Sequence, residues 1–211
     1  MARAVVTTAQ GDAWVDLERP AGELRSLLFL GHGAGGGVDA PDLKAVTAAL
    51  TSNGVAVARV TQPYRVAGKR APVPAPRLDS AWLEVVAAVR RRRGFSALPL
   101  VFCGRSSGAR VACRTSLELP DAVAAVVALA FPLHPPGRPE KSRLEELDGV
   151  EVPTLVVQGD RDAFGLPPGR SSGGADRSVV VIHGADHSLK RDTRAVGDVA
   201  AEFLRSLELA H

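Results

Sequence analysis

A serine between closely spaced glycines is the first feature of this chain that could do chemistry. Residues 104–108 read G-R-S-S-G and stand between an apolar run and a segment in which small residues recur at helical spacing. When a G-x-S-x-G pattern forms a sharp turn from a strand into a helix, the serine hydroxyl stands exposed at the end of the sheet. Gly104 and Gly108 leave room for the strand and the helix to approach each other. The pattern therefore predicts Ser106 as a nucleophile.

A serine hydroxyl is a good nucleophile only when an imidazole removes its proton and a carboxylate orients that imidazole. Further along the chain, an apolar run at 154–157 is followed by Asp160 and Asp162. The next apolar run, 179–182, leads to His187. Turns that follow parallel strands meet at the same edge of a sheet. We predict Asp162 as the orienting acid and His187 as the general base, with Asp160 as the alternative acid in the same turn.

An acyl-transfer site also needs backbone N–H groups aimed at the oxyanion that forms during attack. One donor is expected to be the N–H of Ser107, directly after the nucleophile. The other is expected in the glycine-rich segment 31–37, G-H-G-A-G-G-G, where the backbone can curl toward the reacting carbonyl. We assign this second donor to Ala34.

Other polar residues close to these motifs are candidates for contacts with a substrate. Arg105 precedes the nucleophile, and Lys69 and Arg70 lie in a proline-rich loop, so these cations could favour an anionic substrate. His134 precedes the acid in the chain, which breaks the order of the triad; it is predicted either to line the substrate pocket or to belong to a structural loop. His183 is expected to be a packed or hydrogen-bonded residue at the end of its strand.

The glycine-rich segment also matches a different motif. Residues 31–36 fit G-x-G-x-x-G after a strand and before a helix, as in dinucleotide-binding proteins. That use requires an acidic residue about twenty positions further on, to bind the ribose. Arg59, Thr61 and Gln62 stand there instead. We therefore do not expect nicotinamide or flavin binding.

Short apolar runs alternate with amphipathic helical segments along the whole chain, as in an α/β domain. Strands are predicted at 5–8, 14–17, 24–30, 55–60, 98–103, 124–130, 154–157 and 179–182. Apolar residues recur at helical spacing over 43–50, 78–89, 109–117 and 196–207, a proline-rich loop is expected at 62–76, and a short helix at 144–147.

Strands buried on both faces and separated by helices indicate a mostly parallel sheet that helices cover on both sides. The first strands lie close together without a helix between them, so the N-terminal edge is expected to be antiparallel. We predict a single α/β domain over residues 1–211. The segment between residues 131 and 153 is too short for a lid domain, so the site is expected to be uncapped.

Composition and charge argue against nucleic-acid binding, membrane insertion and a disulfide-bonded secreted protein. The net charge is +3, and the densest basic run, 90–93, closes a predicted helix without interleaved aromatic residues, so nucleic acid is not an expected partner. The longest apolar run is too short to span a membrane, and no secretory signal is visible at the N-terminus. Two cysteines provide no disulfide framework. We expect a cytoplasmic protein without a membrane partner.

Taken together, the motifs resemble those of small α/β-hydrolases of the dienelactone-hydrolase-like kind. They are most similar to the hydrolase-like family shared by a testis-expressed animal protein and a subunit of the NSL histone-acetyltransferase complex. The matching stretches are residues 31–37, 104–110, 131–138, 159–165 and 184–187. This resemblance implies the α/β-hydrolase fold, Ser106, Asp162 and His187 as a catalytic triad, and no cofactor or metal.

From these residues we expect a serine hydrolase that cleaves a carboxylic ester or thioester through an acyl-enzyme intermediate on Ser106. The expected partner is a small-molecule ester or thioester, and the protein is expected to be a monomer or homodimer. Acyl transfer to an acceptor other than water is left open. The alternative is a non-catalytic scaffold or binding protein with the same fold, because a fold alone does not establish a function.

Overall fold

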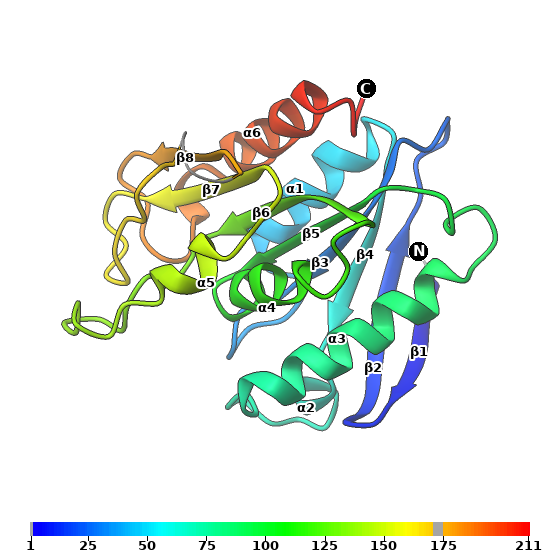
Figure 1. Ribbon diagram of the computed structural model, residues 1–211, viewed down its shortest axis with the longest axis horizontal. Coiled ribbons are helices and arrows are strands. Elements are labelled where there is room, and N and C mark those ends of the chain that lie inside the picture. The colour runs from blue at the N-terminus through cyan, green and yellow to red at the C-terminus, as the bar shows by residue number, and fades with distance from the viewer. Residues whose placement is uncertain (1, 171–174) are drawn as a thin grey trace.

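Eight strands form one sheet in the order β1-β2-β4-β3-β5-β6-β7-β8 in the computed structural model, which describes residues 2–170 and 175–211 (Figure 1). The strands are β1 (Ala2–Thr8), β2 (Gly11–Glu18), β3 (Ser26–Gly31), β4 (Val55–Thr61), β5 (Leu100–Arg105), β6 (Val123–Leu129), β7 (Thr154–Gly159) and β8 (Arg177–Ile182). Strands β3 to β8 run parallel, whereas β2 is antiparallel to both β1 and β4. The expected antiparallel N-terminal edge is confirmed.

Helices cover both faces of the sheet, as the apolar runs predict. They are α1 (Pro41–Thr51), α2 (Pro63–Val66), α3 (Ala75–Arg90), α4 (Ser107–Ser116), α5 (Leu144–Asp148) and α6 (Thr193–Ser206), with a 3₁₀ turn, η1, at Lys190–Asp192. Helices α1 and α6 pack together on one face, and α3 and α4 lie on the other (Figure 1). Successive residues of β3 face opposite layers: Leu28 packs toward α1 and α6, and Phe29 toward α3 and α4.

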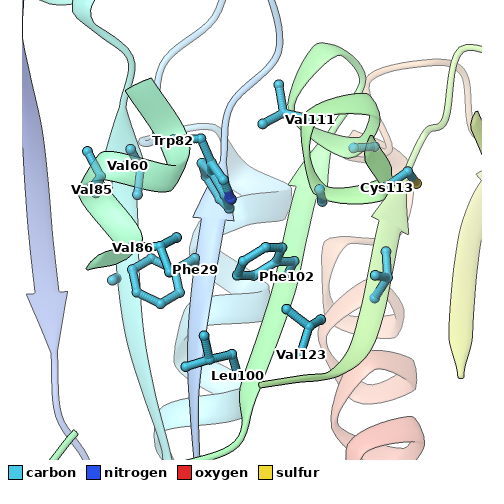
Figure 2. Packing of buried hydrophobic residues seen from close by; sticks show 14 of the residues in the cluster. Phe29, Val60, Trp82, Val85, Val86, Leu100, Phe102, Val111, Cys113 and Val123 are labelled. Carbon is cyan, nitrogen blue, oxygen red and sulfur yellow. The ribbon is translucent and has the colours of Figure 1, made fainter. Parts of the chain in front are cut away.

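Three aromatic rings form the centre of the layer beneath α3 (Figure 2). Trp82 of α3 meets Phe29 of β3 and Phe102 of β5 edge-on, with ring centroids 6.1 and 5.6 Å apart. Such edge-to-face contacts stabilise a core beyond the burial of apolar area. The cluster holds α3 on the two central strands, and β5 carries the serine turn at its end.

Several predicted boundaries differ from the structure by a few residues, and two of the differences have a clear physical cause. The proline-rich segment 62–76 is not all loop, because α2 begins at Pro63 and α3 begins at Ala75; proline fits the first turn of a helix, where its missing N–H has no partner to lose. Strand β5 continues past its apolar residues to Arg105, which pairs with Leu129 of β6. Ladder hydrogen bonds use the backbone, so a polar side chain does not end the strand.

The connection between β6 and β7 contains only the five-residue helix α5. Within residues 2–170 and 175–211, no cap domain therefore covers the edge of the sheet where the parallel strands end. Among the described residues, no helix is long and apolar enough to cross a membrane.

Candidate active site

The turn between β5 and α4 holds Ser106 in a backbone conformation that serine rarely adopts. Its φ is 54° and its ψ is −113°, with the strand ending at Arg105 and the helix beginning at Ser107. A Cβ at Gly104 would collide with the backbone carbonyl of Gly108, and a Cβ at Gly108 would lie 2.6 Å from the carbonyl carbon of Gly31. Both glycines are therefore required for the close approach of α4 to β3 and β5. The strained turn presents the Ser106 hydroxyl at the end of the sheet.

The structure brings Ser106, His187 and Asp162 together in one chain of hydrogen bonds. His187 Nδ1 lies 2.8 Å from Asp162 Oδ2, and His187 Nε2 lies 2.9 Å from Ser106 Oγ. An ionised carboxylate only accepts hydrogen bonds, so the proton of the neutral imidazole is on Nδ1. Nε2 then has a free lone pair, and it accepts from the Ser106 hydroxyl.

Asp160, the alternative acid, points to a different histidine. Its Oδ2 lies 3.3 Å from His183 Nδ1, and its Oδ1 accepts a hydrogen bond from the Gly184 N–H. The His183 side chain is 90% exposed, so the prediction of a packed residue was wrong, although the hydrogen-bonded alternative holds. The difference arises because His183 lies just past the end of β8, outside the layers of the core.

Gln158, a residue that no sequence motif singles out, also binds the Asp162 carboxylate. The Gln158 side chain is buried at the end of β7, and its amide nitrogen lies 2.8 Å from Asp162 Oδ2. The same nitrogen lies within hydrogen-bond distance of the carbonyl oxygens of Phe131 and Gly165. All three partners are acceptors, which fixes the orientation of the amide. Asp162 Oδ1 accepts from the Phe164 N–H at 2.9 Å.

Phe164 also covers the imidazole of His187. Their ring centroids lie 4.2 Å apart, with an angle of 30° between the planes. The stacked ring limits the rotation of His187 and keeps part of the imidazole from water. Phe164 lies two residues after Asp162, within residues 159–165. The family resemblance includes this stretch but predicts no role for Phe164.

The glycine-rich segment after β3 is held by a buried histidine that the sequence did not single out. His32 Nε2 accepts from the Gln62 N–H at 3.1 Å, so its proton is on Nδ1, which donates to the Gly33 carbonyl at 2.8 Å. The Gly36 N–H donates to the same carbonyl. Burial lowers the pKa of His32, which keeps this ring neutral.

This hydrogen bonding sets the direction of the Ala34 N–H. In a trans peptide the C=O and the N–H point opposite ways, so a Gly33 carbonyl held by His32 turns the Ala34 N–H to the other side. The Tyr64 hydroxyl fixes the next peptide by donating to the Ala34 carbonyl at 2.7 Å. A Cβ at Gly33 would lie 3.5 Å from Ser106 Cβ, so this loop lies against the nucleophile.

Ser107 is the first residue of α4, where backbone N–H groups have no partner within the helix. The positive end of the α4 dipole lies at the same place. Ser107 and Ala34 thus offer backbone N–H groups on two elements that both adjoin Ser106.

Of the predicted substrate contacts, Lys69 and Arg70 are exposed to solvent, whereas His134 and Arg105 lie in different surroundings. His134 lies against the turn that carries Asp162. Its backbone N–H donates to the Phe164 carbonyl, and a Cβ built on Gly165 would lie 2.5 Å from the His134 ring nitrogen Nε2. Its Nδ1 lies 2.9 Å from the Pro135 carbonyl oxygen. Arg105 turns toward α1, where a guanidinium nitrogen lies 3.6 Å from Asp42 Oδ1.

A second copy of the G-R-S-S-G sequence occurs at residues 169–173 and lies partly outside the described residues. In the part of the chain that the structure describes, no group of three or more histidine, cysteine, aspartate or glutamate side chains is arranged to hold a metal ion.

The chain matches one protein-family model and resembles several solved structures in fold. Residues 24–207 match the model of a family described as an alpha/beta hydrolase domain. Among solved structures, Est1E from Butyrivibrio proteoclasticus matches with a TM-score of 0.78 and 18% identity, covering 98% of each chain. An α/β serine hydrolase without lid from Xanthomonas campestris matches at 0.77 and 20% identity, over 98% of this chain and 94% of that one. Dienelactone hydrolase from Anabaena variabilis matches at 0.76 and 21% identity, over 97% and 96%. These matches confirm the predicted fold.

Proposed function

This chain belongs to the α/β-hydrolase domain family, and from that premise we propose that it is a serine hydrolase acting on a carboxylic ester or thioester. The observation that carries the proposal is the hydrogen-bond chain from Ser106 Oγ through His187 to Asp162, with lengths of 2.9 and 2.8 Å. A scaffold would not need a strained serine turn aligned with a base and an acid. The scaffold alternative is therefore not favoured.

In the first half of the reaction, Ser106 Oγ attacks the carbonyl carbon of the substrate while its proton moves to His187 Nε2. The imidazolium that forms is stabilised by the Asp162 carboxylate through Nδ1–H. The carbonyl oxygen becomes an oxyanion, and the N–H groups of Ser107 and Ala34 hold it. His187 then returns the proton to the leaving alkoxide or thiolate, and an acyl-enzyme remains on Ser106.

In the second half, His187 takes a proton from water, and the resulting hydroxide attacks the acyl-enzyme carbonyl. The same two N–H groups hold the second oxyanion. When the intermediate collapses, the carboxylic acid leaves and Ser106 recovers its proton from His187. No step requires a cofactor, because the nucleophile, base and oxyanion donors all come from the chain.

The open sheet edge favours small or extended acyl groups over long lipids held beneath a cap. We infer that the protein acts in the cytoplasm on a small-molecule ester or thioester, as a monomer or homodimer. The motif resemblance to the hydrolase-like family of the testis-expressed protein supports this reading of Ser106, Asp162 and His187.

Labelling by a fluorophosphonate probe, read by intact mass, tests the proposal. Wild-type protein should add one probe per chain, and Ser106→Ala should abolish the addition. Ser171→Ala is a matched control, because Ser171 stands at the same position in the second G-R-S-S-G sequence. A panel of esters and thioesters then measures turnover. A folded wild type that neither reacts with the probe nor turns over any ester would restore the scaffold alternative.

A further inference from the structure

Arg105 and Asp42 form a buried ion pair whose polar atoms are poorly satisfied. The nearest atoms are 3.6 Å apart, which is beyond hydrogen-bond distance. The Asp42 side chain is 0% exposed, and neither of its carboxylate oxygens has a hydrogen-bond partner among residues 2–170 and 175–211. Arg105 Nε is also buried without a partner in that part of the chain. Burial raises the pKa of Asp42, and the Arg105 charge together with the nearby backbone N–H groups of Leu43 and Asp42 only partly opposes this shift.

Three arginine–carboxylate pairs elsewhere in the chain have a different geometry. Each of these pairs forms two hydrogen bonds, with distances between 2.5 and 2.8 Å: Arg3–Asp16, Arg110–Glu146 and Arg114–Asp79. An ion pair whose only role is to stabilise the fold is strongest when the guanidinium donates two parallel hydrogen bonds to the carboxylate, as a fork. The Arg105–Asp42 pair lacks the fork even though it is more deeply buried, so its donors are left available to another acceptor.

Arg105 is also close to the reacting centre. It precedes Ser106 directly, and a Cβ built on Gly33 would lie 3.5 Å from Ser106 Cβ and 3.8 Å from Arg105 Nε. The guanidinium and the nucleophile thus both adjoin Gly33 of the glycine-rich segment 31–37, which we call the oxyanion loop, and glycine leaves no side chain between them. The Arg105 side chain is 18% exposed, so one edge of it reaches solvent.

We propose that the substrate carries a carboxylate within a few bonds of the scissile carbonyl, and that Arg105 binds it. This inference rests on the proposed hydrolase function and names its substrate class. Asp42 is a positioning residue: it holds the guanidinium beside the site in the absence of substrate, and it competes with the incoming carboxylate for the same donors.

Two pairs of esters that differ only in charge test the proposal. The first compares mono-para-nitrophenyl glutarate with its methyl ester, which places the charge on the acyl side. The second compares acetylated para-hydroxybenzoate with its methyl ester, which places it on the leaving group. The expected result is a higher kcat/KM for the carboxylate in at least one pair, by about tenfold or more, as for a charge-assisted hydrogen bond.

Arg105→Gln should remove that preference: KM for the carboxylate should rise relative to KM for the neutral ester, so that the ratio of their kcat/KM values falls to about one. Asp42→Asn should act in the opposite direction and lower KM for the carboxylate several-fold, because the competing charge is gone. Loss of a merely structural pair would not improve the binding of one substrate. Arg194→Gln is the matched control: it removes the same charge from a side chain that is 91% exposed, on α6.

The outcomes separate this inference from the proposed function. Turnover of the neutral esters with no preference for either carboxylate overturns the inference and leaves the hydrolase intact. A preference that survives Arg105→Gln, or that Arg194→Gln removes equally, also overturns it. Failure of every ester together with no labelling of Ser106 overturns the hydrolase function itself, and the inference with it.

Discussion

Gln158 and His187 both donate a hydrogen bond to the same oxygen of Asp162, each at 2.8 Å. Gln158 is the second-last residue of β7, and His187 lies in the loop after β8. The Gln158 amide thereby restrains the same carboxylate oxygen that the imidazole binds. Gln158 therefore helps to orient the Asp162 carboxylate, although no hydrogen bond joins Gln158 to Ser106 among the described residues.

Replacing Gln158 with leucine is expected to lower kcat by about tenfold or more with little change in KM, because a hydrogen bond to a buried charge contributes roughly 1.5–3 kcal/mol. Steady-state kinetics on one ester measure both constants. Thr154→Val is the control, since it removes a buried hydroxyl at the other end of β7. Equal losses in the two variants would mean that Gln158 contributes only to stability.

Asparagine at position 162 should lower kcat by about 10²–10⁴-fold, because its amide carries no charge to stabilise the imidazolium and can present an NH₂ donor that favours the wrong tautomer of His187. Asparagine at position 160 should leave kcat within about threefold, since that side chain pairs with the exposed His183. The two substitutions are chemically identical and lie two residues apart in one turn. The assignment is wrong if the larger loss follows Asp160→Asn.

His32 provides a test of the oxyanion loop. Asparagine can replace the Nδ1–H donor to the Gly33 carbonyl, whereas glutamine can replace the Nε2 acceptor for the Gln62 N–H. If the first bond orients the Ala34 N–H, His32→Gln should lose more kcat than His32→Asn. Loss of a complete oxyanion donor costs about 2.7–4 kcal/mol, which sets the upper limit of the effect. Similar kcat values for both variants would exclude this role of His32.

The buried state of His32 also predicts a pH dependence of stability. Burial lowers its pKa in the folded protein below the ordinary value of 6.5. Below pH 6.5, His32 binds a proton in the unfolded chain but stays neutral in the folded protein. The free energy of unfolding should therefore fall as the pH drops. The slope is at most about 1.4 kcal/mol per pH unit for one group.

Urea unfolding of wild type and His32→Asn from pH 7.5 to 5.5 measures this contribution. The wild type should lose more stability over this range, because both proteins share every other histidine. Parallel curves for the two proteins would show that His32 is not the group that titrates.

The sequence by itself determined the fold class and the order of the chemical groups. Apolar runs alternating with helical repeats specify a parallel sheet, and the ends of its parallel strands meet at one edge. That alone brings Ser106, the turn at residues 159–165 and the loop of His187 to the same region. The glycines at 104 and 108 follow from the strand-to-helix turn that the motif predicts, although the close contact of Gly108 with Gly31 of β3 forms only in the fold.

Only the tertiary structure decided which side chains within those loops face each other. Asp160 and Asp162 lie in one turn, and their directions depend on long-range contacts such as the hydrogen bond from the Arg161 N–H to the Ala185 carbonyl. The roles of Gln158 and His32 depend equally on partners distant in the chain. The spacing of apolar residues predicts which face of a helix or strand is buried, but it does not predict the hydrogen-bond partner of a buried polar atom. For the same reason, the sequence placed Arg105 beside the nucleophile, and only the fold placed Asp42 beside Arg105.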